Sequence, residues 1–68
     1  MIKPKDIVLV RDGSVYKWKR AVYSHFDERS MLPFKTTTSS HRCCILFNDE
    51  TKHLEETTNE APSKYIIW

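Results

Sequence analysis

Histidine and cysteine are the residue types in this chain with the strongest metal-binding chemistry. His41 and Cys43 lie two positions apart, so a strand would place both side chains on one face of a sheet. Structural zinc sites usually combine two closely spaced ligand pairs, whereas His25 and His53 stand singly in the sequence. The pattern therefore favours no metal and no cofactor, and it indicates that Cys43 and Cys44 are small apolar strand residues.

The same two cysteines are the candidate nucleophiles. A catalytic cysteine needs an exposed, electropositive setting that lowers the pKa of its thiol. Cys43 and Cys44 instead begin an apolar run that ends at Phe47, where burial would raise the thiol pKa. The single glycine, Gly13, is far from them in the sequence and cannot shape an oxyanion turn beside them. The sequence therefore predicts that the protein is not an enzyme.

Basic and aromatic side chains are interleaved between positions 17 and 25. Such interleaving on a sheet can stack nucleic-acid bases and follow phosphates. A strand would put Trp18 and Arg20 on one face, with Trp18 in the core, and the remaining candidates on the other face. A solvated strand face whose lysines protect a sheet edge is the simpler interpretation. The candidate binding residues of this stretch are Lys17, Lys19, Arg20, Tyr23 and His25.

An acidic, threonine-rich segment covers residues 48–60. Its carboxylates do not follow the spacing of a calcium-binding EF-hand loop, and the central glycine of such a loop is missing. A solvated loop is the simplest interpretation, and a site for a small polar ligand is the alternative. The candidate ligand-binding residues are Glu50, Thr51, His53, Thr57 and Thr58.

These candidates must be positioned by short strands, because no window of the chain has helical periodicity. Asp12-Gly13 lies between two β-rich runs and predicts a hairpin with a positive φ at Gly13. A long second strand should bend near Arg20–Ala21. Residues 48–52 are predicted to be a loop or one helical turn. The expected strands cover residues 7–10, 15–26, 35–38, 41–47 and 64–68, with a further short strand starting at 53–54.

Length and composition fit one small mainly β domain over residues 1–68. Hydrophobic residues make up 40% of the chain and aromatic residues 12%, enough for a compact core but little for a deep cleft. About five strands predict a small, strongly bent five-stranded antiparallel sheet or an SH3-like barrel. The alternative is a three-stranded sheet with one short helix over residues 48–56.

The charge distribution is uneven although the net charge is only +2. Residues 1–25 contain six Lys or Arg and two Asp, whereas residues 26–68 contain five Lys or Arg and seven Asp or Glu. This pattern indicates a polarised surface, and the net charge alone does not identify a nucleic-acid binder. No signal peptide or membrane-length apolar segment is expected. Adjacent cysteines are poorly suited to a disulfide, so we expect a cytoplasmic protein.

Two stretches carry a resemblance. The first contains Val8-Leu9-Val10-Arg11-Asp12, Trp18-Lys19 and Ser24-His25-Phe26, and the second contains Cys44-Ile45, Phe47, Glu50-Thr51-Lys52-His53-Leu54 and Thr57-Thr58. Together they cover about half of the chain and resemble a group of small uncharacterised bacterial and phage proteins. The resemblance transfers no activity, but it implies a binding loop over residues 50–58, flanked by Trp18. This chain has Leu46 where the group usually has proline and Glu56 where it usually has glycine.

The sequence therefore predicts a binding module, with a protein as the first choice of partner. A phage or mobile-element protein that acts on host machinery would fit the resemblance. A nucleic-acid-binding module using residues 17–25 is one alternative, and a small-ligand pocket around His53, Thr57 and Thr58 is the other. No membrane partner is expected, and the oligomeric state is left open.

Overall fold

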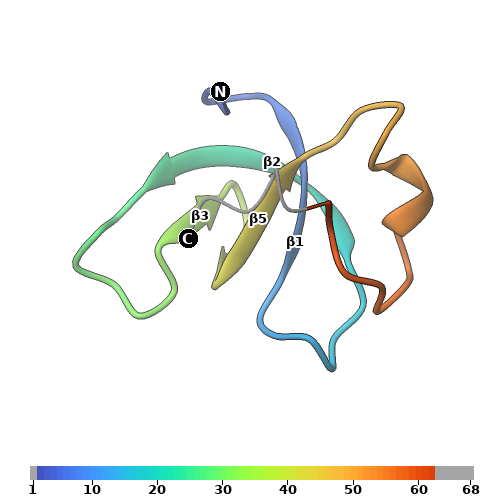
Figure 1. The fold of residues 1–68 in the computed structure, drawn as a ribbon. Helices are drawn as coiled ribbons and strands as arrows, with labels where there is room; N and C mark the ends of the chain where they lie inside the picture. Colours follow the sequence, from blue (N-terminus) through green and yellow to red (C-terminus); the bar gives the residue numbers. More distant parts are fainter. Residues whose placement is uncertain (1, 63–68) are drawn as a thin grey trace.

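The computed structural model describes residues 2–62 and confirms the small, mainly β fold. Its five strands form one antiparallel sheet in the order β4-β3-β2-β1-β5 (Figure 1). The alternative, a three-stranded sheet with a helix over residues 48–56, is wrong. The predicted strand at 64–68 lies outside the described residues. The elements are β1 (Ile7–Arg11), β2 (Lys19–Phe26), β3 (Phe34–Thr36), β4 (Ser40–His41), β5 (Cys43–Leu46) and the 3₁₀ helix η1 (Lys52–Leu54).

The sheet is bent because its two outermost strands are almost continuous in the chain. β4 and β5 stand at opposite ends of the strand order, yet only Arg42 separates them. One residue spans at most about 3.6 Å, so the two ends of the sheet must meet. No ladder joins β4 to β5 within residues 2–62, so this part of the chain is not closed into a barrel.

The longest strand, β2, belongs to both halves of the bent sheet. Its first half pairs with β1, from Lys19 to Val22, and its second half pairs with β3. The register shifts between Tyr23 and His25, and such a bulge increases the local bend. The bend predicted at Arg20–Ala21 therefore occurs, but a few residues later.

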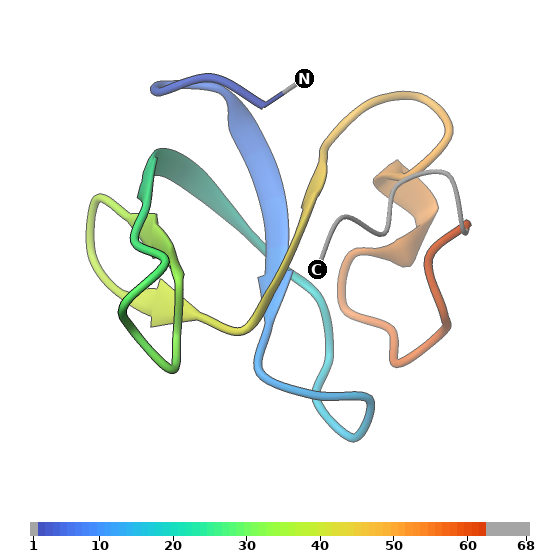
Figure 2. The same cartoon turned by 60° about the vertical axis from the view of Figure 1, so that its left-hand side comes forward.

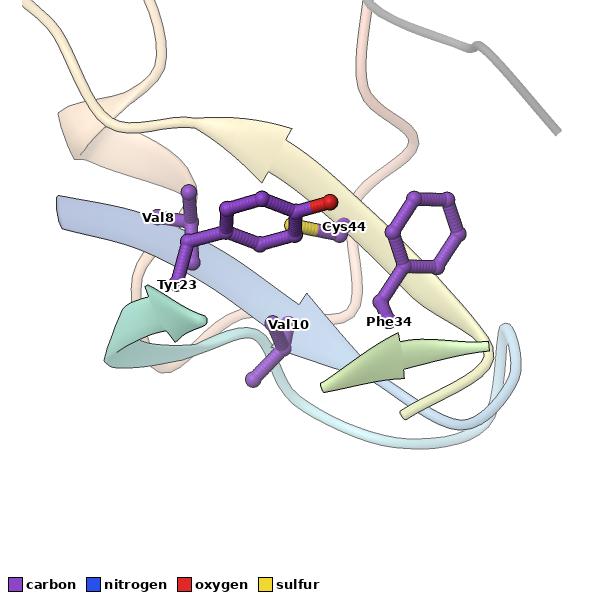
Figure 3. Close-up of a cluster of buried hydrophobic side chains, with 5 residues drawn as sticks. All are labelled: Val8, Val10, Tyr23, Phe34 and Cys44. Carbon is purple, nitrogen blue, oxygen red and sulfur yellow. The ribbon is translucent and has the colours of Figure 1, made fainter. Parts of the chain in front are cut away.

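Two clusters of buried side chains lie on opposite sides of β1, which is central in Figure 2. The strand alternates, so Val8 and Val10 face one side and Leu9 faces the other. Burial on both faces, predicted for residues 7–10, is confirmed for these three residues. The inner cluster is Val8, Val10, Tyr23, Phe34 and Cys44 (Figure 3). The outer cluster is Leu9, Trp18, Ile45, Leu54 and Ala61.

The second strand begins later than predicted. Residues 12–18 form a loop in which Tyr16 N donates to Gly13 O over 3.1 Å, and Gly13 has no positive φ. The β1–β2 hairpin is therefore confirmed, with a longer connection. Phe26, the last residue of β2, follows the register shift between Tyr23 and His25 and is 54% exposed. Residues 53–54 lie in η1 and do not start a strand.

Trp18 should be the residue on which folding depends most. Its side chain is fully buried in the outer cluster, so Trp18→Ala should cost about 3–5 kcal/mol of unfolding free energy. Tyr16→Ala is the matched control, because Tyr16 is 58% exposed and its loss should change stability by about 0.5 kcal/mol or less. Thermal unfolding followed by circular dichroism measures both. A Trp18→Ala protein with an unchanged midpoint would contradict the core assignment.

Candidate functional site

The basic residues predicted to form one surface are divided by the fold. Lys17 and Lys19 are exposed at the start of β2, whereas His25 lies at its far end, about 20 Å away at about 3.3 Å per residue. Tyr23 was expected on this surface, but it is only 8% exposed and belongs to the inner cluster. That assignment is wrong because the bend of the sheet packs the Tyr23 side chain against side chains from β1, β3 and β5.

Arg20 was also a candidate, and its guanidinium is occupied. It donates to both carboxylate oxygens of Glu55, at 3.2 Å from Nε and 2.8 Å from Nη2. It also lies over the Phe47 ring, 4.8 Å from the centroid. The hydrogen bond and charge of Glu55 raise the pKa of Arg20. Arg20 therefore fastens the chain near residue 55 to the sheet, on the face opposite Lys19.

The two remaining lysines line an open hollow at the end of the sheet. We call it the β1–β2 hollow, because six of its seven lining residues come from β1, from β2 or from the connection between them, which projects from the end of β1 opposite the N-terminus (Figure 1). Its volume is about 220 Å³. Tyr16 and His41 were not among the predicted binding residues. The lining residues are Val10, Arg11, Asp12, Tyr16, Lys17, Lys19 and His41.

His41 reaches the hollow because the sheet is bent. β4 lies next to β3 in the strand order, yet His41 Nδ1 is 3.2 Å from Asp12 Oδ1 in the β1–β2 connection. Its Nε2 lies 2.6 Å from Ser39 Oγ. The same Asp12 oxygen accepts from the backbone N of Arg42 at 3.3 Å. These contacts join residues that are 29 and 30 positions apart in the sequence, and they fix one wall of the hollow. No local sequence pattern predicts them.

Arg11 lines the hollow but is committed to the fold. Its guanidinium lies 4.2 Å from the centroid of the Trp18 ring, a cation–π distance. Nη1 donates to Thr58 O at 3.0 Å, and Nη2 lies 3.4 Å from Glu60 Oε1. Nε is buried and has no hydrogen-bond partner among residues 2–62. Arg11 therefore holds the chain at residues 58–60 against the sheet.

Trp18 holds the same segment through its backbone and its ring. Its backbone N donates to Thr57 O at 2.9 Å, and its O accepts from Glu56 N at 2.8 Å. The indole Nε1 donates to Asn59 O at 2.8 Å. We call residues 55–60 the strap. Three successive carbonyls of the strap, at 57, 58 and 59, thus accept hydrogen bonds from Trp18 or Arg11.

The threonines proposed as ligand-binding residues serve local turns. Thr51 is fully buried, and its hydroxyl donates to Leu46 O at 2.7 Å and accepts from Asn48 N at 3.0 Å. The Thr57 hydroxyl donates to Leu54 O at 2.6 Å. The fully buried Thr51 side chain is therefore not accessible as a ligand contact in this structure.

The other candidates of this segment do not form a pocket with them. Glu50, His53 and Thr58 are exposed, and the Thr58 carbonyl accepts from Arg11. The hollow contains none of these residues. A second open cavity, of about 460 Å³, is lined by residues 25–29, at the end of β2 and in the turn that follows it, and His25 is one of these residues. The structure thus keeps the candidates of residues 50–58 apart from those of β2.

Glu56 has an unusual backbone conformation. Its φ is 66°, in the left-handed region that favours glycine. This is the position at which the predicted resemblance implies glycine. The conformation lets Glu56 N reach Trp18 O while the chain turns from η1 into the strap. The second residue of the strap is therefore strained.

The two cysteines lack the lowered thiol pKa that a catalytic cysteine needs. Both are free thiols, Cys44 buried and Cys43 partly buried. Burial, with a smaller effect of Cys43, raises the pKa of Cys44 to about 12, and burial also raises the pKa of Cys43. This agrees with the pKa increase predicted for an apolar run. Within residues 2–62, no three His, Cys, Asp or Glu side chains gather into a group that could hold a metal ion.

Comparisons with protein-family models, with curated proteins and with solved structures find no match for this chain. The resemblance stated from the motifs therefore stays a prediction. Among residues 2–62 there is also no helix with the length and apolar character needed to cross a lipid bilayer. The site must accordingly be judged from its own geometry.

Glu56→Gly should stabilise the protein. The left-handed conformation costs an L-residue about 1–2 kcal/mol, and part of the relief is lost to the greater freedom of glycine in the unfolded chain. We expect a net gain of about 0.5–1 kcal/mol by chemical denaturation. Glu56→Ala removes the carboxylate but keeps the Cβ, so it should give no gain. Equal stabilisation by both variants would attribute the effect to charge and contradict the conformational explanation.

Cys44 should resist alkylation in the native state. A pKa of about 12 leaves roughly a thousandfold less thiolate at neutral pH than an ordinary thiol has. Iodoacetamide labelling followed by mass spectrometry should modify Cys43 first, and Cys44 should react at an ordinary rate in denaturant. Rapid native labelling of Cys44, measured in a Cys43→Ala variant, would show that this thiol is not buried.

Proposed function

We propose that this chain is a protein-binding module whose docking surface is the β1–β2 hollow together with the exposed tip of the β1–β2 connection. The observation that carries the proposal is the exposure of two large apolar side chains at that tip. Val15 is 80% exposed and Tyr16 is 58% exposed, directly beside the hollow. Neighbouring apolar and aromatic side chains at the surface are typical of protein contacts, where tyrosine often supplies much of the affinity.

The rigidity of this surface supports the proposal. β1 and β2 pair residue by residue up to Val10 and Lys19, so both ends of the connection are fixed. Asp12 is tied to β4 by its contacts with His41 and Arg42. A surface that is already ordered loses little conformational entropy on binding. Binding loops held on a rigid sheet are a common arrangement for recognition.

The nucleic-acid alternative retains less support. Lys17 and Lys19 are exposed beside Tyr16, as that function requires, but Arg20 is paired and Tyr23 is buried. His25 lies at the other end of β2. Nucleic-acid affinity usually depends on several phosphate contacts. Two lysines supply few of them.

The small-ligand alternative is also weaker, because two of its candidate hydroxyls, those of Thr51 and Thr57, already donate hydrogen bonds to backbone carbonyls. Binding rather than catalysis is supported by the raised pKa of both thiols. The proposal includes a reducing, cytoplasmic setting, supported by two free cysteines.

A comparative pull-down from native cytosol tests the proposed surface. A protein partner should be retained by the wild type and lost from a Val15→Ser/Tyr16→Ser variant, because the variant removes the apolar contacts. Met31→Ser is the matched control, since Met31 is 82% exposed in a different connection, and it should retain the partner. Capture of the same proteins by all three would contradict the surface. Tight, salt-sensitive binding to oligonucleotides would favour the alternative function.

A further inference from the structure

We propose that the β1–β2 hollow receives the carboxylate of one Asp or Glu side chain from an extended segment of the partner protein, between Lys17 and Lys19. This inference rests on the proposed function and names the chemistry of its partner. Three observations carry it: the charge of the hollow, its size and the apolar tip beside it.

The hollow has an excess of positive charge that one anion would neutralise. Arg11 is matched by Glu60 and by the Thr58 carbonyl, so its charge is already used. Lys17 and Lys19 are exposed, and neither forms an ion pair with a residue in the range 2–62. Asp12 is the opposing carboxylate, and its Oδ1 is engaged by His41 and by a backbone N–H. Two lysines against one carboxylate give an excess of one positive charge.

The size of the hollow also suits a side chain. Pockets for drug-sized ligands usually have about 300–1,000 Å³, and this hollow has about 220 Å³. A carboxylate with its short stem fits such a space, whereas a nucleotide needs more. A polyanionic backbone would also leave most of its charges without a basic partner here. Both arguments favour an acidic peptide over nucleic acid.

The tip of the connection supplies the second part of the contact. Val15 and Tyr16 are exposed immediately before Lys17 in the chain. A partner segment with its carboxylate between the lysines would bring its neighbouring residues against these apolar surfaces. An aromatic or aliphatic residue beside the acid would therefore be favoured. The expected recognition element is an acidic residue next to an apolar one.

Selection from a displayed random-peptide library identifies such segments without knowledge of the natural partner. The wild-type protein should enrich peptides with an Asp or Glu beside an apolar residue. The best peptide is then synthesised with an amidated C-terminus, so that a terminal carboxylate cannot substitute for the side chain. A version with Gln or Asn in place of the acid is its control.

Binding of both peptides is measured by fluorescence anisotropy to the wild type and to a Lys17→Gln/Lys19→Gln variant. The acidic peptide should lose about tenfold in affinity for this variant, because two partly exposed ion pairs are removed. Replacing the acid should weaken binding to the wild type, but it should make little difference for the variant. Lys3→Gln/Lys5→Gln removes the same charge before β1 and should bind like the wild type.

The outcomes separate this inference from the proposed function. Selected peptides that need Tyr16 but tolerate loss of the acid would overturn the carboxylate inference and leave the docking surface intact. Peptides that bind a Val15→Ser/Tyr16→Ser variant as well as the wild type, or no enrichment at all, would overturn both. Binding of oligo-thymidine that depends on Lys17 and Lys19 at low salt would overturn the choice of an acidic peptide over nucleic acid.

Discussion

The contact between Trp18 and the strap is the interaction on which the rest of this structure depends. A chain of 68 residues can bury only a small core. Among residues 2–62, Trp18 is the largest fully buried side chain. The same residue binds the strap with its backbone N, its carbonyl and its indole N–H. The Arg11 guanidinium stacks on the Trp18 ring and donates a hydrogen bond to the Thr58 carbonyl of the strap. One residue therefore combines apolar burial with hydrogen bonding to a segment about 40 positions further along the chain.

This arrangement separates the part of the molecule that holds it together from the part proposed to bind. The outer cluster and the strap lie on one side of β1, and the inner cluster lies on the other. The β1–β2 connection projects from the end of β1, where it can contact a partner while the outer cluster stays buried (Figure 1). The guanidinium groups of Arg11 and Arg20 are paired with carboxylates of the strap. Lys17 and Lys19 form no ion pair with the described residues. The cations that hold the strap are therefore different from the cations proposed to contact a partner.

Much of the fold follows from local pattern, and the candidate site follows less well. The apolar run Val8–Val10 has the composition of a strand buried on both faces, and it is one. Trp18 was assigned to the core from strand alternation, and it is buried there. Tyr23 was assigned to an exposed face because strand alternation distinguishes the two faces of β2. It does not show that other parts of the chain bury both faces. The contact of His41 with Asp12 depends on the bend of the whole sheet, which no window of sequence contains.

The single-residue link at Arg42 has a consequence for how such a fold can diversify. An insertion there would separate β4 from β5 and relax the curvature that brings His41 to the hollow. Residues 13–17 of the connection between β1 and β2 carry no such restriction, because they lie between Asp12, which is tied to β4, and Trp18, which is held in the outer cluster. Changes of length and composition should accumulate in that connection, while the junction at Arg42 stays fixed in length. The scaffold should therefore tolerate variation best at the surface proposed to contact a partner.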